Sequence, residues 1–119
     1  MYEVKTNALK NRLYISVDGA MVKNEVELYK STVKKNVQML KPGFTVAIDL
    51  RKTSVVDQET LLQMQEIKKI AVSAGLSKSA VVMDSAILKM QTSRSFKDVG
   101  PQDKPFTSLE EAEKFLDEK

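Results

Sequence analysis

The sequence predicts a single α/β domain over residues 1–119, with a small, mostly parallel sheet of about four strands, an opening antiparallel hairpin and about four helices. Three observations support this prediction. The 119 residues suffice for one hydrophobic core but not for two. The apolar spacing changes from alternation to a helical period after the first two segments. Short apolar runs then alternate with helical segments, as expected of right-handed crossovers in a parallel sheet.

The chain opens with two predicted strands. Residues 2–7 and 12–17 alternate polar and apolar side chains, which is typical of strands with one buried face. Ala8–Asn11 lies between them and favours a turn, so the strands should pair as an antiparallel hairpin. Asp18 and Gly19 then interrupt the alternation, and the second strand should end there.

A long helix should follow the hairpin. Its apolar residues recur three or four positions apart and fall within an arc of about 80°, which indicates one narrow buried stripe. The members of this stripe are Val22, Val26, Tyr29, Val33, Val37 and Leu40. Pro42 and Gly43 should end the helix, because proline cannot continue it and glycine tolerates the reversal of the chain.

Two short runs predict central strands. Residues 44–50 and 79–83 are β-branched and nearly free of charge, as expected of strands that are covered on both faces. A helix should connect them, with Asp57 as its N-cap and Ala74-Gly75 as its end. The residues on its buried side are Leu61, Met64, Ile67 and Ala71.

The C-terminal part should hold two more helices. Asp84-Ser85 should cap a third helix, and Gly100-Pro101 and Lys104-Pro105 then mark a loop. Ser108 and Glu111 have the spacing of a capping box at the start of the last helix. The residues that this helix should bury are Leu109, Ala112, Phe115 and Leu116.

The composition limits the function classes. The chain has no Cys and no His, which excludes thiolate nucleophiles, disulfides, the common zinc and haem sites and every relay that contains histidine. The 19 Lys and Arg exceed the 16 Asp and Glu, for a net charge of +3. The lysines lie at helical spacing, so we interpret them as solvated helix faces and expect no nucleic-acid partner. The lysines in question are Lys30, Lys34, Lys35, Lys68 and Lys69.

The hydropathy of the chain favours a cytosolic location. No apolar run is long enough to predict a membrane-spanning helix, so we expect no membrane insertion. The polar start, Met1-Tyr2-Glu3-Val4-Lys5, is unlike a signal peptide.

The segment after the first central strand carries a resemblance to a known family. Ile48-Asp49-Leu50 is followed by a short polar stretch, the aliphatic pair Val55-Val56, Asp57 and a helix that opens into Leu61-Leu62. This order resembles the SpoIIAA-like, or STAS-domain, anti-sigma factor antagonists, in which a strand precedes Asp-Ser-Ser-Gly or Asp-Ser-Thr-Gly and a helix. The hairpin, the long first helix and the closing segment from Phe106 to Leu116 extend the resemblance to nearly the whole chain.

Asp57 is the one position of the family's four-residue motif that this sequence keeps. Gln58 stands in place of the first serine, Glu59 in place of the phosphorylated Ser or Thr, and Thr60 in place of the glycine. The permanent charge of Glu59 could hold the site in a state like the phosphorylated one, or it could simply favour the helix dipole. Thr60 or Ser54 could instead accept phosphate at a shifted position.

The resemblance implies a non-enzymatic, bacterial regulatory module that binds an anti-sigma-factor-like or other regulatory protein. Its docking surface should follow the carboxyl end of the central strand, where loops of α/β sheets form a crevice. The predicted partner-binding residues are Arg51, Lys52, Ser54, Asp57, Gln58, Glu59 and Thr60. No catalytic residue and no cofactor is expected. A second copy of the chain is a further candidate partner, because an exposed edge strand can pair with its own copy.

Two alternatives stay open at this point. Asp18, Asp49 and Asp84 stand at or near the ends of predicted strands and could hold Mg²⁺ for phosphoryl chemistry, although each also fits a turn or cap. The similarity of SpoIIAA-like domains to lipid-exchange folds implies a hydrophobic or lipid-like ligand, whose pocket methionines could line. The methionines in or beside predicted elements are Met21, Met39, Met64, Met83 and Met90.

Overall fold

The computed structural model describes residues 2–18, 23–52, 58–84, 100 and 103–118, with the backbone alone at residues 23–24 and 58–61. The elements are β1 (Tyr2–Asn7), β2 (Arg12–Asp18), α1 (Lys23–Val37), β3 (Thr45–Lys52), α2 (Gln58–Ser73), β4 (Lys78–Val82), β5 (Asp103–Phe106) and α4 (Leu109–Asp117). The strands form one sheet in the order β1-β2-β3-β4-β5. β1 is antiparallel to β2, and the other neighbours are parallel. The predicted α/β class and the opening hairpin are confirmed.

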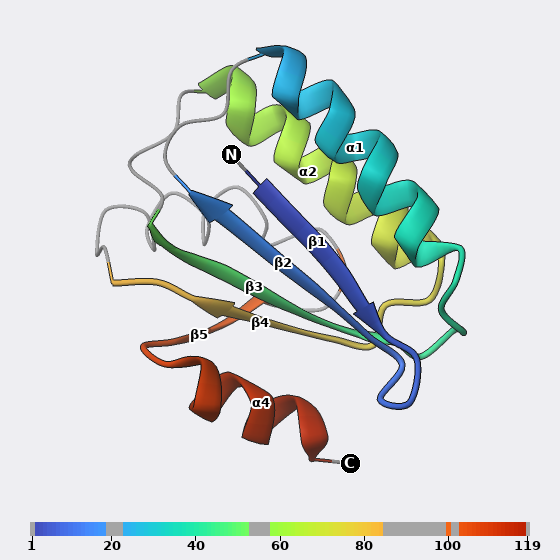
Figure 1. Ribbon diagram of the computed structural model, residues 1–119, viewed down its shortest axis with the longest axis vertical. Coiled ribbons are helices and arrows are strands. Elements are labelled where there is room, and N and C mark those ends of the chain that lie inside the picture. The colour runs from blue at the N-terminus through green and yellow to red at the C-terminus, as the bar shows by residue number, and fades with distance from the viewer. Residues whose placement is uncertain (1, 19–22, 53–57, 85–99, 101–102, 119) are drawn as a thin grey trace.

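The sheet lies between α1 and α2 on one face and α4 on the other (Figure 1). Successive side chains of a strand point to opposite faces, so β3 and β4 contribute to two cores. The larger core, under α1 and α2, includes Leu13, Ile15, Val46, Leu50 and Val81. The smaller core, under α4, consists of Ala47, Ala80, Val82, Ala112 and Leu116. The central strands are therefore covered on both faces, as their composition predicts.

The predicted stripe on α1 is buried. Val26, Tyr29, Val33 and Val37 are each 5% exposed or less. The helix ends at Val37, about one turn before the predicted end at Leu40, which is partly buried beside the larger core. The chain turns at residues 38–40 ahead of Pro42, whose ring restricts the residue before it to extended backbone.

Two glycine turns meet beside the amino-terminal ends of β3 and β4. Gly43 and Gly75 have φ angles of 93° and 110°, and the Gly43 N–H donates to the Gly75 carbonyl at 2.7 Å. A Cβ atom at Gly75 would lie 2.7 Å from the Cα of Pro42, whereas a Cβ at Gly43 would meet nothing within 4 Å. The two glycines therefore share the backbone requirement, but at Gly75 alone there is also no space for a side chain.

Gly75→Ala is expected to lower the free energy of unfolding by about 2–4 kcal/mol, because it combines the cost of positive φ with a backbone clash. Gly43→Ala is the matched control and should cost about 1 kcal/mol, for the backbone alone. Urea unfolding of both variants measures the difference. Equal losses would mean that the approach to Pro42 has no energetic consequence.

Predictions for the C-terminal part need correction. Lys104-Pro105, expected in a loop, lies within β5, a strand beyond the predicted four that pairs with β4. Proline is compatible with this position because β5 lies at the edge of the sheet. Leu109 is 38% exposed instead of buried. The predicted cap is confirmed, since the Ser108 Oγ accepts the Glu111 N–H at 3.2 Å. The predicted third helix lies outside the described residues.

Candidate functional site

The carboxyl ends of β2, β3 and β4 lie at one edge of the sheet, because the three strands are parallel (Figure 1). Arg51 and Lys52 end β3, and both are exposed. Lys52 is the register partner of Asp18 in β2, next to a β-bulge. Asp84 is exposed just after β4. This edge, which we call the charged edge, thus carries both cations and carboxylates.

Arg51 is held in one orientation by Asp49. The two residues are two positions apart in β3, so their side chains lie on the same face of the sheet. Arg51 Nε donates to Asp49 Oδ1 at 3.0 Å, and Arg51 Nη2 donates to Oδ2 at 2.8 Å. The Arg51 backbone N–H adds a bond of 3.0 Å to Oδ1. The result is a bidentate pair on a rigid strand, with 39% of the arginine side chain exposed.

The same pair determines the ionisation of Asp49. Hydrogen bonding by the Arg51 side chain lowers the pKa of Asp49 below its ordinary value of 3.8, although partial burial acts in the opposite direction. Asp49 is therefore ionised at neutral pH and keeps Arg51 in place.

The predicted docking residues are described to different extents. Arg51 and Lys52 lie on the charged edge with their side chains described. Gln58, Glu59 and Thr60 form the first turn of α2 and are described by their backbone. Ser54 and Asp57, with the predicted N-cap, lie outside the described residues. The docking surface as a whole stays a prediction.

The three aspartates are not gathered into a metal site. Within residues 2–18, 23–52, 58–84, 100 and 103–118, no three acidic side chains are close enough together to hold a metal ion. In addition, Arg51 engages both oxygens of Asp49, so a metal ion at this carboxylate would have to displace the arginine. The Mg²⁺ alternative with Asp18, Asp49 and Asp84 finds no support in this arrangement.

A cavity of about 60 Å³ lies between the sheet and the pair α1 and α2. Its walls are mostly apolar, and Lys68 and Asp103 contribute its charged groups. Ligand pockets usually measure roughly 300–1,000 Å³, so the space left by the described residues does not fit a lipid-like ligand. Of the methionines considered for such a pocket, Met64 lines the cavity, Met83 is buried and Met39 is 64% exposed. Met21 and Met90 lie outside the described residues.

Lys68 is not part of a solvated face, contrary to the prediction. It is 9% exposed, and its Nζ donates to Asp103 of β5 at 3.0 Å. The Asp103 side chain is itself 12% exposed, so the pair is largely buried. Ile67 belongs to the buried stripe of α2, and Lys68 is rotated from it by about 100° around the helix axis. Lys68 therefore lies at the border of the apolar face. Its partner belongs to the strand that the sequence does not predict.

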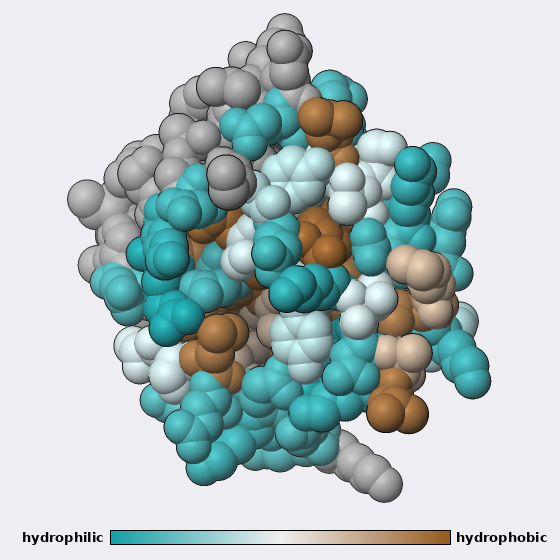
Figure 2. All heavy atoms as spheres, in the orientation of Figure 1, coloured by the Kyte–Doolittle hydropathy of each residue, from teal (hydrophilic) through white to brown (hydrophobic). Residues whose placement is uncertain are grey.

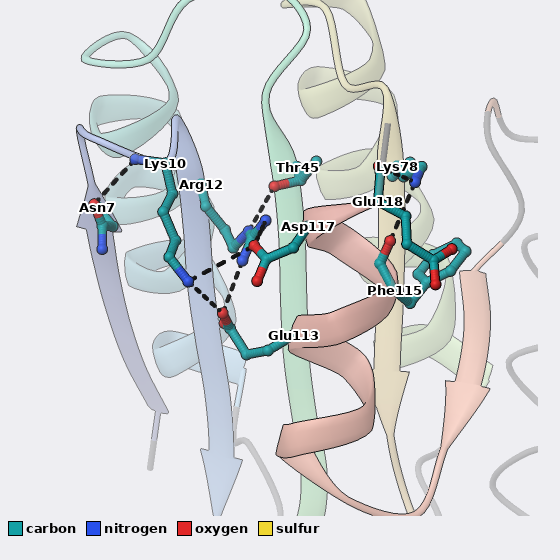
Figure 3. A network of polar contacts seen from close by, with 9 residues as sticks. All are labelled: Asn7, Lys10, Arg12, Thr45, Lys78, Glu113, Phe115, Asp117 and Glu118. Carbon is teal, nitrogen blue, oxygen red and sulfur yellow. Dashed lines mark hydrogen bonds and ion pairs between the residues drawn. The ribbon is translucent and has the colours of Figure 1, made fainter.

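The sequence-based predictions also do not include a buried charged cluster around Arg12, at the opposite end of β2. Arg12 is 3% exposed, and Figure 3 shows its guanidinium between Thr45, Glu113 and Asp117. Arg12 Nε donates to Thr45 Oγ1 at 2.8 Å, and Nη1 donates to Glu113 Oε2 at 2.8 Å. Arg12 Nη2 lies 2.9 Å from Asp117 Oδ1, and Lys10 Nζ lies 3.0 Å from Glu113 Oε2. This cluster joins the hairpin and β3 to α4.

Two features of the sequence could have indicated this cluster. Glu113 and Asp117 are four residues apart on the last helix, so they share one face. Arg12 opens a strand whose other residues are uncharged up to Asp18. A neighbouring contact completes the attachment of α4, since Lys78 Nζ donates to the carbonyls of Phe115 and Glu118 at 3.1 and 2.6 Å (Figure 3).

The architecture matches solved structures at low sequence identity. The anti-sigma factor antagonist SpoIIAA in its unphosphorylated form has a TM-score of 0.65 and 11% identity, covering 97% of this chain and 96% of its own. An uncharacterised DUF3478-family protein with a SpoIIAA-like fold from Shewanella loihica PV-4 has a TM-score of 0.74 and 10% identity, covering 98% and 92%. No family model and no curated protein matches the sequence.

These comparisons define the class of the fold. The chain has the SpoIIAA-like, or STAS, fold, as the resemblance around Asp57 implies. Of the helices described, none is long and apolar enough to cross a membrane.

Proposed function

We propose that this chain is a cytosolic, non-enzymatic regulatory module that binds a protein partner at the charged edge and the first turn of α2. The SpoIIAA-like fold supports the proposal, because SpoIIAA is an anti-sigma factor antagonist. The single observation that carries it is Arg51, which is exposed and yet held by three hydrogen bonds to Asp49. A cation that is already oriented loses little conformational freedom on binding, so it suits recognition of a charged protein surface.

Glu59 gives this module a fixed charge instead of a switch. The resemblance places it where the family carries a phosphorylated hydroxyl, and a carboxylate cannot be phosphorylated by that chemistry. One permanent negative charge in the first turn of α2 is favoured by the helix dipole. We infer that the partner-binding state of this chain does not depend on phosphorylation at this position.

The absence of catalysis is part of the proposal. Without His or Cys, a general base would have to be a carboxylate, lysine or tyrosine with a pKa shifted toward neutral pH. At the charged edge, the pKa of Asp49 is instead lowered by Arg51, away from the range that a general base needs. The chemistry of this edge therefore favours binding.

Charge reversal at the proposed surface tests the function. The wild-type chain serves as bait for affinity capture from its native cell, and the captured protein is purified for binding measurements. Glu59→Lys and Arg51→Glu are each expected to weaken binding by about tenfold or more, with a larger effect at low salt, because both alter electrostatic steering. Lys41→Glu, at an exposed site ahead of the amino-terminal end of β3 and therefore at the opposite end of the sheet, is the control and should bind normally.

Thermal unfolding separates binding from folding. Both charge reversals lie at exposed or helix-initial positions, so the melting temperatures should stay close to that of the wild type. If Glu59→Lys lowered the melting temperature and left partner binding intact, the surface would be assigned to the wrong residues.

A further inference from the structure

β1 forms one edge of the sheet. It pairs with β2 on one side, and no strand of the described part of the chain lies on its other side (Figure 1). An edge strand directs half of its backbone N–H and C=O groups away from the sheet, where a further strand can pair with them. Tyr2 stacks on Tyr29 of α1 with ring centroids 5.3 Å apart, and its hydroxyl lies 3.3 Å from the Thr32 Oγ1. These contacts hold the edge in position against α1.

The charges on β1 are complementary to themselves. Glu3 and Lys5 lie on the same face, their charged atoms 3.2 Å apart, with side chains 63% and 71% exposed. If two β1 strands pair antiparallel around a two-fold axis at Val4, Glu3 of each copy lies opposite Lys5 of the other. Moving the axis to Glu3 or to Lys5 places like charges opposite each other, which is unfavourable. The charge pattern thus selects one register.

The other face of β1 fits the same register. Tyr2 and Val4 are partly buried against the larger core, and in this register Val4 faces its own copy while Tyr2 faces Thr6. Leu28 is 61% exposed and lies one helical turn before Thr32, on the side of α1 that faces Tyr2. Figure 2 shows hydrophobic surface in the middle of this view, over β1 and α1. A second strand along β1 would cover part of this surface.

We propose that the chain forms a two-fold symmetric dimer in which β1 pairs antiparallel with β1 of a second copy and joins the two sheets into one. Charges on an edge strand usually prevent such pairing by repulsion. Here Glu3 and Lys5 have opposite charges, and in the register centred on Val4 they form two symmetry-related ion pairs between the copies. The dimer leaves the carboxyl end of β3 uncovered, so it does not depend on the proposed partner-binding function.

Single charge reversals should disrupt the dimer in predictable ways. Sedimentation velocity across a concentration series is expected to show a monomer–dimer equilibrium for the wild type. Glu3→Lys gives a basic edge and Lys5→Glu an acidic edge, so each should raise the dimer dissociation constant by about tenfold or more. The double variant Glu3→Lys with Lys5→Glu restores opposite charges at each position and should dimerise like the wild type.

A mixture of the two single variants provides the sharpest test. The basic edge of Glu3→Lys faces the acidic edge of Lys5→Glu in the same register, so the mixture should form heterodimers where neither variant alone dimerises. Both side chains are exposed, so the melting temperatures should stay unchanged at concentrations where the wild type is monomeric. A wild type that remains monomeric at about 1 mM would overturn the proposal, since this corresponds to negligible affinity. So would single variants that dimerise normally, or a mixture that fails to associate.

Discussion

Arg12→Met is expected to lower the free energy of unfolding by about 3–5 kcal/mol, because it removes one partner of a buried ion-pair cluster. Arg12 is 3% exposed, and its guanidinium is the group that joins Thr45, Glu113 and Asp117. Methionine replaces the length of the side chain but none of its hydrogen bonds. The carboxylate of Glu113 then stays partly buried with Lys10 as its remaining cation. Urea unfolding measures the loss.

Lys10→Met is the matched control for this prediction. Lys10 binds the same oxygen of Glu113 at 3.0 Å, but its side chain is 42% exposed. Exposed ion pairs contribute little because water and salt screen them, so the loss should be much smaller than at Arg12. If both variants lost the same stability, burial of the guanidinium would not be the cause.

The cluster also predicts the acid stability of the chain. Burial raises the pKa of Glu113, but the nearby Tyr14 hydroxyl, Lys10 and Arg12 together hold it below its ordinary value of 4.5. Hydrogen bonding by Arg12 lowers the pKa of Asp117 below 3.8. Both carboxyl groups therefore have a lower pKa in the folded chain than in the unfolded chain. The stability that they contribute is fully present above their ordinary pKa values, and it is lost as the pH falls through their folded-state pKa values. In Arg12→Met this loss of stability in acid should shrink, as unfolding at a series of pH values would show.

Lys68→Met is expected to have the second large effect, a loss of about 3–5 kcal/mol. The ammonium of Lys68 lies 3.0 Å from a carboxylate oxygen of Asp103, and the two side chains are 9% and 12% exposed. Removing the ammonium leaves the charge of Asp103 beside an apolar cavity. Lys69→Met, one residue further along α2 at an exposed position, should change the stability by less than about 0.5 kcal/mol.

A double variant identifies the cause of that loss. Lys68→Met combined with Asp103→Leu removes both charges and adds apolar atoms next to the cavity. Replacing a buried ion pair by apolar residues of similar size is often neutral or stabilising, so the double variant should recover most of the stability that Lys68→Met loses. A double variant as unstable as the single one would show that the unpaired carboxylate is not responsible.

Hydropathy patterns were enough to predict most of the described elements. The alternation in residues 2–7 and 12–17 and the stripe along α1 reflect one-sided burial, which a local window of sequence records directly. β5 has no such pattern, because its four residues, Asp-Lys-Pro-Phe, neither alternate nor favour a strand. Pairing with β4 makes this segment a strand, and that pairing is a long-range contact.

The candidate site divides in the same way. The pattern of residues 44–50 predicts a central strand that ends at Leu50, with Arg51 and Lys52 in the loop after it. In the structure both residues belong to β3 and are exposed at its carboxyl end. The bidentate pair between Asp49 and Arg51 involves only residues of β3, but its geometry depends on the extended backbone, which places both side chains on one face. The separation of Asp18, Asp49 and Asp84 depends on how three strands lie beside one another, so the sequence left the metal alternative open.

The sequence by itself determined the elements from β1 to β4, the last helix, the hairpin, the buried stripe of α1 and the charge pattern of β1, since each depends on residues that are near neighbours in the chain. The tertiary structure alone decided which charges are buried. Arg12 meets Glu113 across 101 positions and Lys68 meets Asp103 across 35. A lysine or arginine side chain is buried only where it can pair with a carboxylate, and the position of that carboxylate depends on how the whole chain folds.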